Sequence, residues 1–496
     1  MAFHLLTAEV QAAMNSAWAS ATRLKHPAVT VEHLLLALLD EPTCVAALTS
    51  RGAHVGRMRD RLGRLLETRE RGEGEPKLTV GVERVLHRAA NKAEREHRTG
   101  DGADLLDALL REEESAAWAV LHDEGVGHNE AMTVRLQRPA FELDENGFTK
   151  QRVALQRTGV EVVDLTVANP TSVGLSPTGV VLPAVDVYEP DSFGTQAARD
   201  AVSRFTGVPA ERLLLSASTS EAYAWLFKLL NGDVLVPAPC YPLLEHLAEL
   251  EQVRVHHYPL RYEGRWHTDS PLIVNAATAQ TRAVVAVSPG NPTGTYLGDS
   301  EAHALAQLCA ARGWALIIDE VFAEPSRSCA RHEWPCLTFT LGGLSKSCGL
   351  PQLKLAWCGV HGPGAEAALE RLGLIADTYL SVSSPVQAAA GELLEKHAAA
   401  FRARVAERCA VNRAQLQRVL PATWQLLESE GGWSAVIRVP QDLDEEARCL
   451  AALGRGVAVH PGYFYDFPSG AHLVLSLLAP PDVFAEGVSR LTREAR

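Results

Sequence analysis

The sequence predicts a mostly parallel α/β domain preceded by an all-α repeat domain. Two observations lead to this prediction. Short apolar runs in the second half of the chain each end in a polar residue, and a helical stretch separates two of them, as in a parallel sheet covered by helices. The segment 1–135 instead carries a helical apolar pattern that occurs twice.

The size and charge of the chain exclude several classes of protein. Its 496 residues suffice for two or three domains, and 47% apolar with 22% charged residues is ordinary for a globular protein. The net charge of −13 argues against a protein that binds nucleic acid or an anionic membrane. The longest apolar runs are too short to span a bilayer.

The N-terminal and cysteine patterns favour a cytoplasmic protein. Residues 1–10 lack the basic start of a signal peptide and lead into an amphipathic helix. The nine cysteines are scattered without a Cys-x-x-Cys pair, which suits a reducing compartment. We predict no metal site, and we expect Cys240 and Cys348 to be inert packing residues.

The repeat in the segment 1–135 is visible at two places. Leu6-Thr7 with Val10 and Met14 recurs as Leu78-Thr79 with Val82 and Leu86, and the leucine-rich run 34–39 recurs at 105–110 with nearly the same offset. Both copies have helical spacing of their apolar positions. We therefore expect an all-α domain at 1–138, with a boundary at Arg138-Pro139-Ala140, and an α/β domain at 139–496.

Three apolar runs of the second half have the composition of buried strands, and each precedes a polar side chain. The runs are 283–288, 315–318 and 337–341, and the polar residues that follow them are Asn291, Asp319 and Lys346. Because the carboxyl ends of parallel strands share one edge of a sheet, an amide, a carboxylate and an amine should converge there in a ligand crevice.

Lys346 is the most informative residue of this group. An amine held just past a strand end is placed to bond a cofactor aldehyde, and the neighbouring Ser345 and Lys354 offer a hydroxyl and a cation for a phosphate. A surface loop with two ordinary lysines would give the same local pattern. Likewise, Asp319 with Glu320 alone is more often a helix cap, so the convergence of the three strand ends carries the prediction.

These segments resemble the signature set of a known family. Pro289-Gly-Asn-Pro-Thr-Gly294, Ile318-Asp-Glu-Val321 and Leu344-Ser-Lys-Ser347 with Lys354 are similar to the motifs of class I/II aminotransferases. The resemblance covers roughly residues 150–496. It implies the fold of a type I pyridoxal-phosphate transferase, with a large cofactor domain at about 185–385 and a small α/β domain built from 139–184 and 400–496. A long helical stretch, roughly 384–419, should link the two.

The resemblance also implies roles for the three convergent residues. Lys346 would carry pyridoxal 5'-phosphate covalently and then move the α-proton of the substrate. Asp319 would keep the pyridine nitrogen protonated, and Asn291 would bond the ring oxygen. Enzymes of this kind transfer an amino group between an amino acid and a 2-oxo acid, and most are homodimers.

Further residues match cofactor contacts of the family. Ser218, Thr219 and Ser220 open a helix whose free amides would hold the phosphate, although a plain capping box with Glu221 has the same pattern. Tyr241 matches the aromatic side chain that stacks on the cofactor ring. Tyr188 matches a tyrosine that reaches the phosphate of the partner subunit. For either tyrosine alone, core packing is the commoner role.

Three positions depart from the family pattern. Phe322 stands where a tyrosine usually contacts the cofactor oxygen, and Gly343 stands where a phosphate-binding serine is common. Val474 occupies the position of the arginine that grips the substrate's α-carboxylate. Arg438, in the neighbouring expected strand, is a weak substitute, since it lies about 16 Å past the Gly-Gly-Trp turn.

The first domain resembles the Clp N-terminal repeat domain, most clearly in Thr30-Val-Glu-His-Leu-Leu-Leu-Ala-Leu-Leu39. In Clp proteases and disaggregases this domain docks substrates and adaptors onto an ATP-driven motor. No phosphate loop of the Gly-x-x-x-x-Gly-Lys-Ser/Thr type occurs in the chain, so a chaperone motor is excluded. Recruitment of a protein partner and a purely stabilising appendage both remain open.

We therefore expect a pyridoxal-phosphate aminotransferase with an N-terminal protein-interaction module. Because the carboxylate arginine is missing, elimination, decarboxylation or cyclisation on a specialised substrate is an alternative. A Clp-type adaptor with a degenerate cofactor scaffold is a third hypothesis, which the retention of Lys346, Asp319 and Asn291 argues against.

Overall fold

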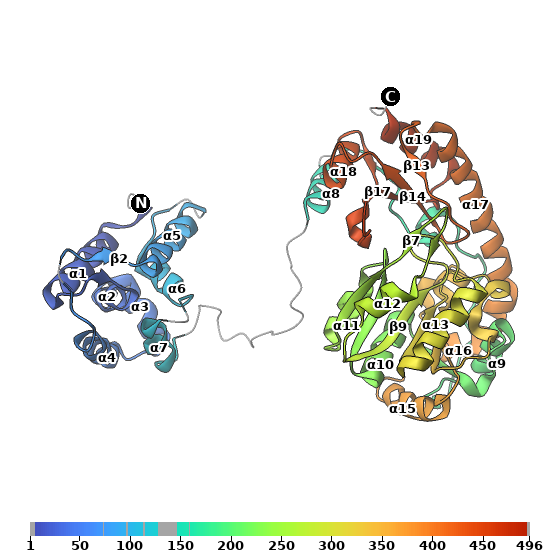
Figure 1. The fold of residues 1–496 in the computed structure, drawn as a ribbon, viewed down its shortest axis with the longest axis horizontal. Coiled ribbons are helices and arrows are strands. Elements are labelled where there is room, and N and C mark those ends of the chain that lie inside the picture. Colours follow the sequence, from blue (N-terminus) through green and yellow to red (C-terminus); the bar gives the residue numbers. More distant parts are fainter. Residues whose placement is uncertain are drawn as a thin grey trace. The chain divides into compact units, whose positions relative to one another are not determined.

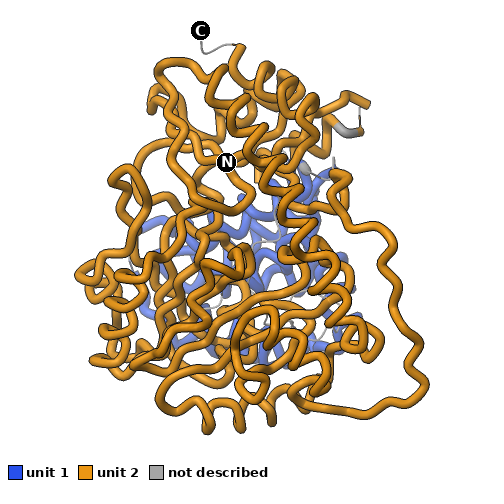
Figure 2. Tube along the Cα trace, turned by 90° about the vertical axis from the view of Figure 1, so that its right-hand side faces the viewer, with its two compact units in different colours: residues 1–136 blue, residues 137–496 orange. Residues whose placement is uncertain are grey.

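The computed structural model describes residues 5–126 and 146–493, apart from residues 73, 96–97, 113–114 and 158. The chain divides into two compact units, residues 1–136 and 137–496 (Figure 2). The boundary expected at Arg138-Pro139-Ala140 lies outside the described residues and stays a prediction.

The described part of the first unit is all-α apart from two short strands, as the sequence predicts (Figure 1). Its elements are α1 (Ala8–Leu24), β1 (Ala28–Val29), α2 (Val31–Leu38), α3 (Pro42–Ser50), α4 (Val55–Glu67), β2 (Lys77–Leu78), α5 (Val80–Arg95), α6 (Gly102–Leu109) and α7 (Ala116–Asp123). Helices α1 and α5 begin at positions 8 and 80, and α2 and α6 begin at positions 31 and 102, so the offset is nearly the same in both pairs. The duplicated sequence pattern is therefore a duplicated pair of helices.

The helices of the first unit bury their leucines in one core. Leu34, Leu35, Leu38, Leu105 and Leu109 are fully buried in it. Each copy of the repeat thus supplies equivalent apolar side chains, so neither copy could bury its own face without the other.

The second unit is built on a seven-stranded sheet with the order β4-β12-β11-β10-β9-β5-β6. The strands are β4 (Leu213–Ser216), β5 (Asp233–Ala238), β6 (Val255–Pro259), β9 (Thr281–Val287), β10 (Ala315–Asp319), β11 (Thr338–Gly343) and β12 (Ala356–His361). Within this sheet only β12 runs antiparallel to its neighbours. The mostly parallel sheet is therefore confirmed.

Helices cover both faces of this sheet. They are α9 (Gln196–Thr206), α10 (Thr219–Leu230), α11 (Leu243–Leu250), α12 (Ser270–Ala276), α13 (Asp299–Arg312), α14 (Leu344–Ser347) and α15 (Ala365–Asp377). Val285 and Ile317 pack in the cluster that contains α10, α11 and α15, whereas Val284 and Leu316 pack in the cluster that contains α12 and α13. Because alternate residues of each strand face opposite helical layers, the strands are apolar without interruption.

A smaller antiparallel sheet, ordered β13-β14-β17-β16, forms the rest of the second unit. Its strands are β13 (Gln425–Leu426), β14 (Ser434–Val439), β16 (His460–Pro461) and β17 (Ala471–Ser476), accompanied by α8 (Gly147–Arg157), α18 (Glu445–Gly454) and α19 (Pro481–Thr492). Two-residue strands form the pairs β3 (Val163–Asp164) with β15 (Val457–Ala458) and β7 (Arg261–Tyr262) with β8 (Trp266–His267).

The long helical stretch expected over 384–419 consists of three consecutive segments. They are α16 (Ser384–Glu392), a π-helical turn over Leu393–His397, and α17 (Ala398–Val419). Among the described residues, no helix combines the length and the apolar character that crossing a membrane requires.

Each unit has its own apolar core, so we expect residues 1–136 to be dispensable for folding of the rest. A fragment that begins near residue 140 should keep the cooperative thermal transition of the second unit and its near-ultraviolet circular dichroism. A fragment that is soluble but lacks that transition would show instead that the first unit completes the second.

Candidate active site

The carboxyl ends of β9, β10 and β11 lie side by side and carry the predicted polar residues. Val287 pairs with Asp319, and Asp319 pairs with Leu341, all in parallel register. Asn291 follows β9, Asp319 ends β10, and Lys346 lies in α14 directly after β11. The structure therefore brings these residues to one edge of the sheet, as the sequence predicts.

Asp319 is a desolvated carboxylate with two hydrogen bonds. Its Oδ1 accepts from the backbone N–H of Val321 at 3.0 Å, and its Oδ2 accepts from the hydroxyl of Tyr223 at 3.2 Å. Burial raises the pKa of Asp319 to about 6, although the two hydrogen bonds by themselves lower it. A carboxylate kept out of water in this way favours a positively charged partner over solvent.

Tyr223 is a site residue that sequence reasoning missed. It lies one turn into α10, is almost fully buried, and links this helix to the end of β10 through Asp319. Burial raises the pKa of its hydroxyl far above the ordinary range, so the group stays a donor. The available signal was its place shortly after Ser218, which puts a tyrosine near the start of a helix that packs on the sheet.

Lys346 points its amine toward aromatic rings and a backbone carbonyl. Its Nζ donates to Ala168 O at 3.1 Å and lies 4.7 Å from the centre of the Trp433 ring and 5.5 Å from that of Phe322. Burial lowers the pKa of Lys346 to about 8. Above that pH the amine is mostly neutral, and it can then act as a nucleophile or accept a proton.

A cavity of about 270 Å³ opens beside Lys346. Phe322, Phe401, Val405 and Trp433 give it apolar walls. Charged side chains complete the lining: Arg402 and Arg413 from α17, Glu324 from the segment after β10, and Glu430 from the turn before β14. The space next to the amine is thus partly shielded from water and holds several fixed charges.

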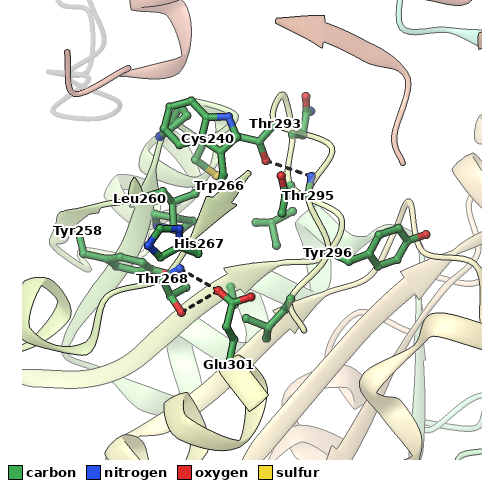
Figure 3. Close-up of a pocket in the computed structure, with 17 residues that line it drawn as sticks. Cys240, Tyr258, Leu260, Trp266, His267, Thr268, Thr293, Thr295, Tyr296 and Glu301 are labelled. Atoms are coloured by element: carbon green, nitrogen blue, oxygen red, sulfur yellow. Dashed lines mark hydrogen bonds between the residues drawn. The ribbon is translucent and has the colours of Figure 1, made fainter. Parts of the chain in front are cut away.

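Asn291 lines a second, smaller cavity of about 40 Å³. Figure 3 shows the residues that line this cavity. Among them, Glu301 of α13 accepts hydrogen bonds from the backbone N–H and the hydroxyl of Thr268. These bonds fasten the β7–β8 hairpin to α13 and so support the loop that carries Asn291.

The first turn of α10 is both a capped helix end and a cluster of free donors. Ser218 caps the helix, since its Oγ accepts from the backbone N–H of Glu221 at 3.1 Å. Thr219 and Ser220 follow as the first helical residues, and backbone N–H groups at such positions have no partner within a helix. The Ser218 cap is observed, while the Glu221 side chain accepts from the backbone N–H of Ala217 instead of that of Ser218, so the capping box is incomplete. Phosphate binding by these residues stays a prediction.

The other predicted cofactor contacts lie at the surface of the single chain. Tyr241 is 48% exposed and Tyr188 is 66% exposed, while Lys354 is exposed in a left-handed backbone conformation. Ser345 is half-buried in α14 beside Lys346. The Nζ of Lys346 bonds a backbone carbonyl rather than any of these side chains, so their roles stay predictions.

The three departures from the family pattern have structural counterparts. Phe322 packs edge-on against Trp433 with ring centres 5.1 Å apart. At Gly343 a Cβ atom would lie 3.1 Å from Ala356 Cβ and 3.2 Å from Leu355 O, because β12 pairs closely there. A serine at this position would therefore be crowded.

Val474, the third departure, lies in a wholly apolar and aromatic cluster. It is 2% exposed and packs with Trp266, Leu427, Val436 and Tyr465. Arg438, the expected substitute, instead stacks over Tyr262 at 5.3 Å and bonds the Gln425 side chain. It does not line the cavity beside Lys346.

The mostly parallel sheet, with an amine and a buried carboxylate at its carboxyl edge, is the architecture of the fold type I aminotransferases. The chain matches the family described as aminotransferase class I and II over residues 188–474, and it belongs to that family. Residues 5–124 match the Clp repeat N-terminal domain. The chain is thus an aminotransferase with a Clp-type N-terminal domain.

Relatives and solved structures agree with this assignment. The chain is 26% identical over 403 residues to the alanine aminotransferase of Mycobacterium tuberculosis (strain ATCC 25618 / H37Rv), covering 73% of this chain and 91% of the relative. It is 26% identical over 263 residues to glutamate-pyruvate aminotransferase AlaA of Escherichia coli (strain K12), covering 48% and 64%. The structure of the alanine aminotransferase from Pyrococcus furiosus shares the fold, with a TM-score of 0.61 and 20% identity over 69% of this chain and 94% of that one.

The residues at the sheet edge fit the pyridoxal phosphate that this family uses. Pyridoxal phosphate needs an amine that loses its proton near neutral pH and can bond its aldehyde. It also needs a carboxylate beside its protonated ring nitrogen and hydrogen-bond donors around its phosphate. Lys346 with its lowered pKa, the desolvated Asp319 and the first turn of α10 supply these three.

We expect Val474→Arg to destabilise the second unit rather than restore carboxylate binding. A guanidinium placed among buried apolar side chains without a partner costs about 3–5 kcal/mol. The same substitution at the exposed Val483 of α19 is the matched control and should change stability by about 0.5 kcal/mol or less. Denaturant unfolding of both variants measures the difference, and equal stabilities would show that the cluster around Val474 has room for a cation.

Proposed function

We propose that this chain is a pyridoxal-phosphate aminotransferase that moves an amino group between a small amino acid and a 2-oxo acid. The observation that carries the proposal is the placement of two groups at the carboxyl ends of the adjacent parallel strands β10 and β11. The desolvated Asp319 ends β10, and Lys346, with a pKa lowered to about 8, lies in α14 directly after β11. The names of the relatives, which include alanine and glutamate-pyruvate aminotransferases, favour alanine, glutamate or their oxo acids as substrates.

The cofactor, when bound, supplies an aldehyde that bonds amines and a ring that accepts electrons. In this proposal Lys346 Nζ provides the covalent attachment and later carries the substrate's α-proton, which its lowered pKa permits near neutral pH. Asp319, as a carboxylate, would hold a proton on the ring nitrogen, and its hydrogen bonds from the Tyr223 hydroxyl and the Val321 N–H would keep it in place.

The remaining residues would bind and orient. Ser218, Thr219 and Ser220 offer hydroxyls and helix N–H groups to the phosphate, with Ser345 and Lys354 as further donors. Asn291 and Tyr241 would contact the ring. Tyr188, which lies in an exposed segment with Val181 and Val187, would reach the phosphate of a second subunit in a homodimer.

A second candidate function keeps the cofactor and changes the reaction. The apolar cluster around Val474 favours it, because a substrate without an ordinary α-carboxylate would not need an arginine there. For the N-terminal unit we propose recruitment of a protein partner. The expected cytoplasmic location stays a prediction.

The covalent attachment can be tested directly. Incubation with pyridoxal phosphate, reduction with borohydride and peptide mapping should place the label on Lys346. The rate of labelling should rise as the pH passes about 8, because the neutral amine is the nucleophile. A label on another lysine in the folded protein would contradict the assignment of Lys346.

Asp319→Asn should leave cofactor binding largely intact and slow turnover. A charge-assisted contact of this kind contributes roughly 1.5–3 kcal/mol, which corresponds to about ten- to a hundredfold in rate. The measurement is the turnover rate at saturating substrate, with cofactor content determined on the same sample. Unchanged turnover would show that another carboxylate serves the ring nitrogen.

A further inference from the structure

The cavity beside Lys346 contains arginine side chains that could bind a carboxylate, whereas the Val474 position has none. If Nζ of Lys346 removes the α-proton, the α-carbon must lie within about 3–3.5 Å of that atom. The α-carboxylate is one bond further on, so it must also lie next to Lys346. Among the residues that line the cavity there, two are arginines of α17, Arg402 and Arg413.

Arg402 has a free donor in this part of the molecule. Its Nε donates to Glu324 Oε2 at 2.9 Å, and its guanidinium lies over the Phe205 ring at 5.4 Å. Its Nη1 is buried and has no hydrogen-bond partner among the described residues. A buried guanidinium N–H without an acceptor is costly, and a carboxylate oxygen is the acceptor that satisfies it best.

Arg413 contributes charge that no ion pair among the described residues neutralises. Its Nη1 donates to Ser429 Oγ at 3.0 Å and its Nη2 to Leu427 O at 2.6 Å, both neutral acceptors. The two glutamates of the lining already have cationic partners, since Glu324 pairs with Arg402 and Glu430 with Arg327. Among the described residues Arg413 thus makes no direct ion pair on the cavity wall, and Glu428 is the acidic side chain that acts on its charge from a longer distance.

The rest of the lining strengthens this effect. Phe322, Phe401, Val405 and Trp433 keep water away from the charged groups, and an ion pair is stronger in such surroundings. The volume of about 270 Å³ suits a small amino acid or oxo acid rather than a polymer.

We propose that this cavity is the carboxylate subsite of the enzyme, with Arg402 Nη1 as the donor to the substrate carboxylate and Arg413 as the supporting cation. The inference rests on the proposed function, because it takes Lys346 as the residue that meets the α-carbon. It assigns the recognition of an anionic group to α17 instead of β17.

The test compares substrates that differ only in charge. Holoenzyme is mixed with L-alanine, L-glutamate or L-alaninamide, and the half-reaction is followed by cofactor absorbance to give an apparent Kd and a limiting rate. Arg402→Gln should raise the Kd of alanine and glutamate about ten- to a hundredfold, with a smaller change in the limiting rate. It should leave alaninamide within about twofold, and Arg402→Lys should recover part of the alanine affinity.

The control is Arg418→Gln, an exposed arginine of the same helix whose Nε donates to the Ala414 carbonyl within it. It should change nothing. Equal weakening of alanine and alaninamide in Arg402→Gln would mean a structural role, and an unchanged Kd for alanine would place the carboxylate elsewhere. Either result overturns the inference while the proposed function stands.

A second measurement distinguishes a failure of the carboxylate subsite from a failure of the proposed function. Calorimetric titration of the holoenzyme with propionate reports carboxylate binding without turnover. If no amino acid is converted, the proposed function fails. Propionate binding that is lost in Arg402→Gln and kept in Arg418→Gln would still support the subsite, and equal or absent binding in all three proteins would overturn it.

Discussion

The desolvation of opposite charges at the carboxyl edge of the large sheet is the constraint on which the site depends. Asp319 ends β10, and Lys346 lies in α14 directly after the adjacent parallel strand β11. Burial shifts both pKa values toward neutrality, to about 6 and about 8. Each shift makes the charged form unfavourable without a partner. The sheet therefore holds two groups whose charges are most stable when a ligand of complementary charge lies between them, and this is what a cofactor with a ring cation and an aldehyde provides.

The strand ends were predictable because buried parallel strands have a simple pattern. The runs 283–288, 315–318 and 337–341 correspond to β9, β10 and β11 within a few residues. The main difference is at Gly342 and Gly343, which the sequence suggested as the end of a strand. They belong to β11 because β12 pairs with it through Gly343 and Ala356. Local sequence cannot show such a pairing, since the partner strand lies beyond the loop.

Contacts between distant side chains could not be predicted in the same way. Tyr223 bonds Asp319 across 96 positions of the chain, and Ala168 accepts from Lys346 across 178. The segment of Tyr223 is recognisable in the sequence only as the start of a helix, and no motif at Ala168 predicts its contact with Lys346. Arg402 is one of many arginines of a long helix, and no local motif distinguishes it. Its burial depends on the turn after β10, which brings Glu324 to it.

Under the proposed function and the proposed subsite, the enzyme separates two tasks, cofactor chemistry and recognition of an anionic group. Cofactor chemistry depends on the sheet edge, whose geometry follows from strand order and register. Recognition of an anionic group depends on where a cation is placed, and β17 is closed to it because Val474 fills the space with its apolar neighbours. Helix α17 runs past the same amine and carries arginines at positions 402 and 413, about three turns apart. Side chains three turns apart lie on the same face of a helix, so both arginines can face the cavity. Placing the carboxylate-binding arginine on this helix instead of on β17 therefore requires no change in the sheet. Such a change would alter substrate preference and leave the chemistry of Lys346 and Asp319 intact.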